Sequence, residues 1–151
     1  MIFNTVNINF PTLSFFQEKN LLSFQETNTL LKNKTGIVDF FEKEEDFVQL
    51  KEMLEINENI VSESRVEYGD FQTNKQLAES VCKYLHNKNI SPKILLEPTC
   101  GKGNFILSAI KRFSSLEQVF GIEIQEKYLW HLKFELLEYF LNNPTDRKSV
   151  V

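Results

Sequence analysis

A glycine-containing turn between a short apolar run and a helical segment is the feature that most constrains this chain. The run Ile94-Leu95-Leu96 ends in Glu97-Pro98, and the chain then turns through Gly101-Lys102-Gly103. The residues from about 104 to 113 predict a helix. Short unbroken apolar runs are typical of buried strands in parallel sheets, and glycine lets the backbone approach a ligand closely. The pattern therefore predicts a buried strand, a ligand-binding turn and a helix that begins where the turn ends.

A second strand and a long helix follow. Residues Val119 to Glu123 predict the strand, and residues Gln125 to Leu141 predict the helix. Its expected inward residues are Tyr128, Leu129, Leu132, Leu136, Leu137 and Phe140. Strand, turn, helix, strand and helix in this order form a βαβ unit of the doubly wound class. The expected fold class is α/β, with part of a doubly wound, Rossmann-like sheet.

Another helix is predicted ahead of the first strand. Thr73 and Gln76 have the spacing of a capping box, with the threonine at the N-cap. In the helix that follows, Leu77, Val81 and Leu85 share one face, which we expect to be buried. The turn-prone residues 87–89 should end this helix.

The N-terminal part is expected to be mainly helical. The alternation from Val6 to Phe10 predicts a short strand before Pro11, and residues 14–33 predict a loose helix that Thr35-Gly36 interrupts. A firmer helix is predicted from Val38 to Ile56, and residues 57–66 have the composition of a linker. The chain is therefore divided into a helical segment, residues 1–64, and a partial ligand-binding domain, residues 65–151.

Composition narrows the class of protein. The chain has 151 residues, of which 42% are hydrophobic, so it can bury a core and is not expected to be disordered. Two cysteines are too few for a framework of disulfide bonds, which favours a reducing, cytoplasmic setting. There is no apolar run long enough to span a membrane and no signal-peptide pattern at the N-terminus. The net charge of −4 argues against nucleic-acid binding by bulk charge; it is −6 over residues 1–64 and +2 over residues 65–151.

The charged residues at the two predicted strand ends indicate the ligand. Glu97 would repel a pyrophosphate but attract an ammonium group, and Ile106 replaces the third glycine of the dinucleotide fingerprint. Glu123 follows Gly101 by 22 residues, the position of the usual acceptor for ribose hydroxyls in this topology. An amino group near the first strand and a ribose near the second together describe S-adenosylmethionine.

Other reactive side chains have no supporting pattern. Cys82 occupies an apolar helical position, and Cys100 lies in the turn without a nearby base to activate it. The two histidines lack metal-ligand spacing with the cysteines. We therefore predict neither a catalytic residue nor a metal site.

Three segments together resemble the adenine-specific DNA methyltransferases of restriction–modification systems. Residues Glu97 to Phe105 are similar to their motif I, and Gly121-Ile122-Glu123-Ile124 is similar to motif II. Gly69-Asp70-Phe71-Gln72-Thr73 resembles motif X, although Asn74 stands where that motif has proline. The order X, I, II is that of the gamma class, and the resemblance covers residues 66–141.

The resemblance implies a class I methyltransferase sheet and a role for individual residues in holding S-adenosylmethionine. Phe71 and Thr73 would touch its methionine part, Glu97 would bind its ammonium group, and Glu123 would accept hydrogen bonds from its ribose, with Ile124 against the adenine. The remaining implied cofactor-binding residues are Pro98, Thr99, Gly101, Gly103, Asn104 and Phe105. Thr73 as a simple helix cap and Phe71 as a core aromatic are the alternatives.

The catalytic motif of this family, Asn/Asp-Pro-Pro-aromatic, has no counterpart in the sequence. Asn142-Asn143-Pro144-Thr145 lacks the second proline and the aromatic residue. The implied function is therefore the cofactor-binding portion of an enzyme that methylates adenine in DNA, with DNA bound through a part not present here. The alternatives are a non-enzymatic S-adenosylmethionine-binding or interaction protein, and part of an RNA or protein methyltransferase.

So short a doubly wound sheet should leave an open edge and an uncovered apolar face. We expect the chain to self-associate, to cover the sheet with its N-terminal segment, or to complete it with a complementing methyltransferase chain.

Overall fold

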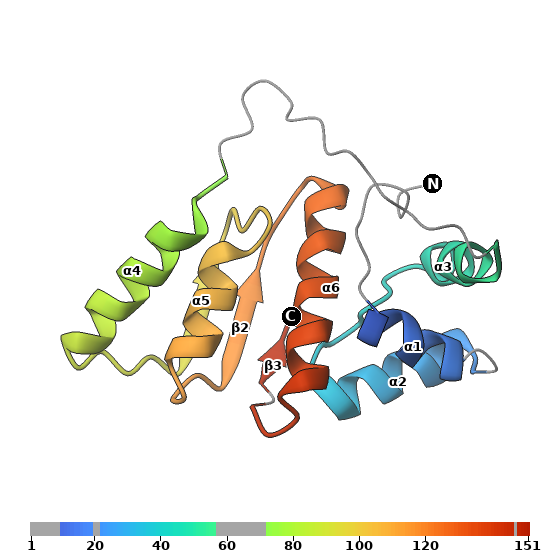
Figure 1. The fold of residues 1–151 in the computed structure, drawn as a ribbon, viewed down its shortest axis with the longest axis horizontal. Helices are drawn as coiled ribbons and strands as arrows, with labels where there is room; N and C mark the ends of the chain where they lie inside the picture. Colours follow the sequence, from blue (N-terminus) through green and yellow to red (C-terminus); the bar gives the residue numbers. More distant parts are fainter. Residues whose placement is uncertain (1–9, 20–21, 57–71, 147) are drawn as a thin grey trace.

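The computed structural model of this chain describes residues 10–19, 22–56, 72–146 and 148–151, which form an α/β fold (Figure 1). The strands are β1 (Ile94–Glu97), β2 (Gln118–Gly121) and β3 (Ser149–Val150). The helices are α1 (Phe10–Glu18), α2 (Phe24–Thr35), α3 (Glu44–Ile56), α4 (Lys75–Asn87), α5 (Asn104–Arg112) and α6 (Glu126–Asn142). None of the helices in these ranges is long and apolar enough to cross a membrane.

The three strands form a parallel sheet in the order β1-β2-β3. Helix α5 connects β1 to β2 and α6 connects β2 to β3, so the predicted βαβ arrangement is confirmed. The second strand ends at Gly121 instead of Glu123, which places Glu123 in the loop after the strand. Strand β1 pairs with β2, and within the described ranges no strand pairs with its other edge.

The N-terminal segment closes the opposite edge of the sheet. The amide of Val38 donates to the carbonyl of Val150 at 2.9 Å, and the amide of Val150 donates to the carbonyl of Gly36 at 3.1 Å. These bonds hold residues 36–38 beside β3 in a parallel bridge. Part of the expected cover by the N-terminal segment is therefore present at β3, whereas no described residue pairs with the free edge of β1.

Local contacts correct the helix boundaries predicted for the N-terminal segment. The single loose helix is two helices, and α2 ends at Thr35 with Gly36 at φ +84°. Helix α3 begins at Glu44, six residues later than predicted, because the side chain of Asn28 binds both backbone groups of Phe41, at 2.8 and 3.0 Å, and keeps that residue out of a helix. The prediction of a strand before Pro11 is wrong for Phe10, because this residue begins α1. Residues 6–9 of that predicted strand lie outside the described residues, as does the predicted linker.

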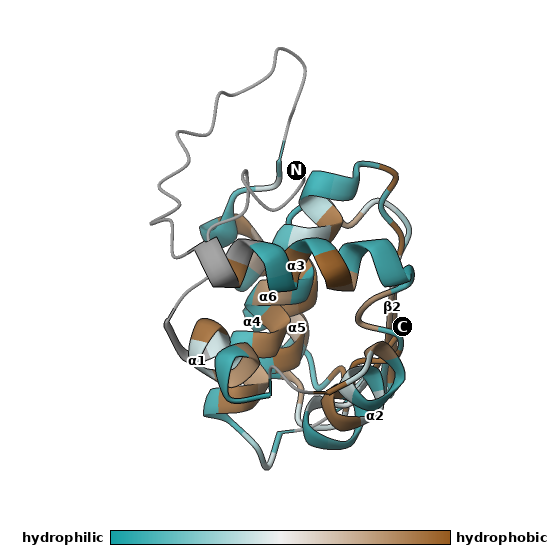
Figure 2. Ribbon diagram, turned by 90° about the vertical axis from the view of Figure 1, so that its right-hand side faces the viewer, coloured by the Kyte–Doolittle hydropathy of each residue, from teal (hydrophilic) through white to brown (hydrophobic). Residues whose placement is uncertain are grey.

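The core joins the N-terminal helices to the long helix α6. Phe40 and Phe41 are buried against Trp130, with ring centroids 5.7 Å from the indole in both cases. The predicted inward residues of α6 are buried except Leu129, which is half-buried. Figure 2 shows that α1, α2 and α3 carry both hydrophobic and hydrophilic stretches, as expected of helices with one face on a core.

Helix α4 differs from its prediction at its cap and its buried face. Asn74 is the N-cap, and its side chain accepts a hydrogen bond from the amide of Gln76 at 2.8 Å. The prediction of Thr73 as the N-cap of a capping box is therefore wrong, because the cap lies one residue later. The buried residues are Ala78 and Cys82, whose small side chains allow close packing on α5. Leu77, Val81 and Leu85 are exposed by 56%, 36% and 38%, because no described element packs on their side of the helix.

Strand β1 is also exposed on one face. Ile94 and Leu96 are exposed by 59% and 63%, whereas Leu95, which points the other way, packs against the core. The prediction of a parallel strand is confirmed, but the prediction that this strand is buried is wrong for the face that carries Ile94 and Leu96.

Candidate functional site

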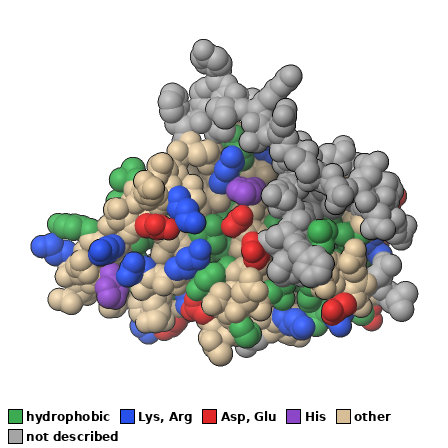
Figure 3. Space-filling model, in the orientation of Figure 1, with side chains coloured by type: hydrophobic (Ala, Val, Ile, Leu, Met, Phe, Trp, Pro, Cys, Tyr) green, Lys and Arg blue, Asp and Glu red, His purple; other side chains and the backbone are tan. Residues whose placement is uncertain are grey.

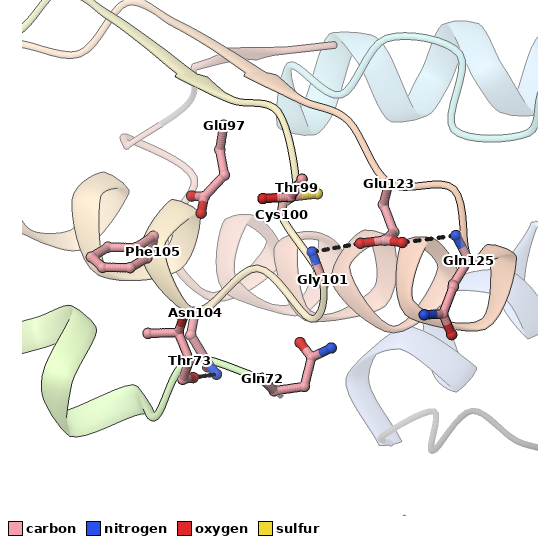
Figure 4. Close-up of a pocket in the computed structure, with 10 residues that line it drawn as sticks. All are labelled: Gln72, Thr73, Glu97, Thr99, Cys100, Gly101, Asn104, Phe105, Glu123 and Gln125. Carbon is pink, nitrogen blue, oxygen red and sulfur yellow. Dashed lines mark hydrogen bonds between the residues drawn. The ribbon is translucent and has the colours of Figure 1, made fainter. Parts of the chain in front are cut away.

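A cleft of about 330 Å³ lies at the carboxyl end of the sheet, beside the loops that follow β1 and β2 (Figure 4). Its walls come from the segment before α4, the turn after β1, the first turn of α5 and the loop after β2. The lining residues are Gln72, Thr73, Glu97, Thr99, Cys100, Gly101, Asn104, Phe105, Glu123 and Gln125. In α/β sheets, this end of the strands is where ligands bind.

The turn after β1 depends on two glycines with left-handed backbone. Gly101 has φ +52° and Gly103 has φ +78°, and Gly103 precedes the first residue of α5. A Cβ atom on Gly101 would lie 2.2 Å from Oε1 of Gln72, and one on Gly103 would lie 2.1 Å from Cδ1 of Leu132. Both positions therefore favour glycine by their conformation, and Gly103 also requires it for space because Leu132 is buried, whereas the end of the Gln72 side chain can shift.

Glu123 connects the loop after β2 to the glycine turn. Its Oε2 accepts from the amide of Gly101 at 2.8 Å, and its Oε1 accepts from the amide of Gln125 at 2.8 Å. Figure 4 shows the carboxylate between these two amides. A carboxylate has about four acceptor positions, so a fixed Glu123 keeps capacity for donors on a ligand in the cleft.

Glu97 is the second carboxylate of the cleft and ends β1. Burial raises its pKa above the usual value for a glutamate. In the part of the chain that the structure describes, no basic side chain forms an ion pair with it. A half-buried carboxylate without a cation is stabilised when a positively charged ligand group binds beside it.

The segment before α4 closes the cleft on its third side. The backbone carbonyl of Thr73 accepts from Nδ2 of Asn104 at 2.7 Å. Oε1 of Gln72 accepts from the amide of Lys102 at 2.9 Å. These two bonds join residues about 30 positions apart and fix the segment against the turn.

Most of the residues that the sequence analysis assigned to the cofactor line this cleft. Thr73, Glu97, Thr99, Gly101, Asn104, Phe105 and Glu123 do so. Pro98 is exposed outside the lining, and Gly103 is buried beneath the turn against Leu132. Ile124 lines a neighbouring cavity, and Phe71 lies outside the described residues.

Three further residues, Gln72, Cys100 and Gln125, line the cleft but were not predicted from the sequence to bind the cofactor. Each is adjacent in sequence to an assigned residue, so proximity to the motifs was the available signal. Cys100 is buried, and burial together with Glu123 and Glu97 raises the pKa of its thiol to about 11. Such a thiol is almost fully protonated at neutral pH and is a poor nucleophile.

Two other features of the sequence lie away from the cleft. Asn143 caps the end of α6, so Asn143-Pro144 belongs to the connection that enters β3 at the opposite end of the sheet. Within the described ranges, no group of three His, Cys, Asp or Glu side chains could hold a metal ion.

Comparison with known proteins identifies one relative. The chain is 46% identical over 83 residues to the type II methyltransferase M.NspV of Nostoc sp. (strain ATCC 29411 / PCC 7524). The matched region is 55% of this chain but only 17% of the length of M.NspV. No family model matches the chain, and no solved structure matches it. The chain is thus a partial homologue of a methyltransferase, and its small parallel sheet is compatible with an α/β fold.

Proposed function

We propose that the cleft binds S-adenosylmethionine and that the chain is the cofactor-binding portion of a DNA adenine methyltransferase. The observation that carries the proposal is the pair of carboxylates at the ends of adjacent strands. Glu97 has no described cation partner, and Glu123 is fixed by two amides in the same cleft. The ammonium group of the cofactor would bind Glu97, and its ribose hydroxyls would donate to Glu123. The relationship to M.NspV supports the same reading.

The complete reaction would transfer a methyl group from the sulfonium sulfur to the amino nitrogen of adenine. Held by Glu97 and Glu123, the cofactor would supply an electrophilic methyl group; the sulfur would keep the electron pair of the broken bond, and the adenine nitrogen would release a proton. Holding the adenine requires the Asn/Asp-Pro-Pro-aromatic motif, which this sequence does not contain. We therefore assign cofactor binding to this chain and catalysis to a part of the enzyme beyond it.

DNA contact is likewise assigned to the rest of the enzyme. Figure 3 shows Lys and Arg side chains gathered over α4 and α5 with Asp and Glu among them. A cavity of about 190 Å³ there is lined by Lys75, Lys102 and Lys111, and also by Glu79 and Glu135. Such mixed charge does not form the positive surface that phosphate binding needs.

The open edge of β1 supports a partner that continues the sheet. Ile94 and Leu96 of β1 are exposed beside this edge, and Leu77, Val81 and Leu85 of α4 are exposed as well; open strand edges and exposed apolar residues are normally covered. Either a complementing methyltransferase chain or a second copy of this one would cover this edge. A non-enzymatic binding protein is the second candidate function, since the cleft is formed without the catalytic motif.

The test is calorimetric titration with S-adenosylmethionine. Glu97→Gln and Glu123→Gln each remove a carboxylate that the cofactor needs, so each should weaken binding at least tenfold, about 1.4 kcal/mol. Glu117→Gln is the matched control, because Glu117 lies at the amino end of β2 in an exposed pair with Lys93 and should leave the affinity unchanged. Absence of binding, or equal affinity in all four proteins, would overturn the proposal.

A further inference from the structure

A second cavity, of about 260 Å³, lies beside the cleft and shares Glu123 with it. One side is formed by the N-terminal segment and the other by the loop after β2 and the start of α6. The lining residues are Glu42, Lys43, Asp46, Glu123, Ile124, Glu126, Leu129, Trp130 and Lys133. Because Glu123 lines both spaces, one ligand can occupy the cleft and this Asp46 cavity together.

Asp46 is the unusual residue of this cavity. It lies in the first turn of α3 and is only 8% exposed. No hydrogen bond or ion pair of its carboxylate is found among the residues that the structure describes. Burial, with Glu126 nearby, raises the pKa of Asp46, although Lys43 and Lys133 oppose the shift. Buried polar groups normally have a hydrogen-bond partner, so this carboxylate is suited to a donor from a ligand.

Two lysines, Lys43 and Lys133, line this cavity with Asp46, and Lys133 is already engaged. Nζ of Lys133 donates to the carbonyl of Phe40 at 3.0 Å and to Glu42 at 2.9 Å. It also lies 4.9 Å from the centre of the Trp130 ring. These contacts hold Lys133 in place, and among the described residues neither Lys133 nor Lys43 forms an ion pair with Asp46.

Between its charged side chains, the cavity has an apolar part that is suited to a flat ring. Ile124 is 94% exposed, Leu129 is half-buried, and both line the cavity together with Trp130. An exposed isoleucine beside a buried carboxylate offers one surface for stacking and one acceptor for hydrogen bonding. A heterocycle that carries an amino group satisfies both.

We propose that the adenine base of the cofactor occupies the Asp46 cavity and that Asp46 accepts a hydrogen bond from its exocyclic amino group. This inference rests on the proposed function, since the base is joined to the ribose that Glu123 would bind. The N-terminal segment then selects the base as well as covering β3. A purine with an oxygen in place of the amino group would direct that oxygen at the carboxylate and be rejected.

The test compares two ligands that differ only at this position, S-adenosylhomocysteine and S-inosylhomocysteine. The wild-type chain should prefer the adenine ligand by about ten- to a hundredfold, as expected when a buried acceptor loses its donor. Asp46→Asn should bring the two affinities close together, since an amide can donate to the oxygen of the inosine ligand. Glu45→Gln is the control, because Glu45 is exposed and does not line the cavity.

The outcomes separate the two proposals. If the wild-type chain binds both ligands equally, or if Asp46→Asn keeps the wild-type preference, the role of Asp46 is overturned while cofactor binding stands. If the wild-type chain binds neither ligand, the proposed function fails together with this inference. The ratio of two affinities within one protein does not depend on how much of a variant is folded. The wild-type preference tests the proposal even if the asparagine variant fails to fold.

Discussion

Replacing Gly103 by alanine places a methyl group between the glycine turn and helix α6. The backbone of Gly103, at φ +78° and ψ 25°, is left-handed, and an L-residue there costs about 1–2 kcal/mol. The new Cβ would lie 2.1 Å from Cδ1 of Leu132, a side chain that is 4% exposed and cannot move into solvent. Overpacking of this kind costs about 1–3 kcal/mol. Together these effects predict a loss of about 2–5 kcal/mol in the free energy of unfolding.

Urea denaturation followed by circular dichroism measures this loss, and a double-mutant cycle with Leu132→Ala isolates the steric part. Leu132→Ala alone should cost about 2–5 kcal/mol, because it opens a cavity in the core. In the double variant the methyl group enters that cavity, so the combined loss should be smaller than the sum by at least about 1 kcal/mol. Additive losses, or a loss below about 1 kcal/mol for Gly103→Ala, would show that the turn is not packed as described.

Three further predictions concern ionisable groups. The affinity for S-adenosylmethionine should weaken as the pH falls through the raised pKa of Glu97, because protonation removes the charge that binds the ammonium group; calorimetry over pH should show this in the wild type and not in Glu97→Gln. Alkylation of Cys100 by iodoacetamide should be slow at pH 7 and accelerate toward pH 11, and a midpoint near 8.5 would refute the buried thiol. Because the pKa of Asp46 is raised in the folded state, ionisation of this carboxyl opposes folding. The free energy of unfolding should therefore be highest, with respect to this group, below its unfolded pKa, and should decline as the pH rises through its folded pKa. Asp46→Asn should therefore stabilise the unliganded chain at neutral pH, with a gain over wild type that shrinks on acidification in urea titrations; a destabilised variant would count against a buried, unpaired carboxylate.

Local sequence signals were sufficient for the βαβ unit. The apolar run of β1, the glycines of the turn and the long periodic pattern of α6 each specify their element without distant contacts, and all three are present. The position of Glu123 in the cleft follows from the same topology, because the ends of neighbouring parallel strands meet at one edge of the sheet.

Features that depend on distant contacts could not be predicted. Helix α4 carries a stripe of large apolar residues and, beside it, a stripe with Ala78 and Cys82, and periodicity alone favours the larger residues. Only the described fold shows that the smaller stripe packs on α5. Likewise, the late start of α3 depends on Asn28, 13 positions from Phe41, and the Asp46 cavity depends on packing of residues about 80 positions apart.

The most direct test of the central claim is a crystal structure of the chain grown with S-adenosylhomocysteine. We expect the amino group of the ligand to lie within hydrogen-bond distance of Glu97 and both ribose hydroxyls to face Glu123, with the glycine turn unchanged. A ligand bound elsewhere on the chain, or bound in the cleft with its amino group away from Glu97, would contradict the assignment of this cleft to the cofactor.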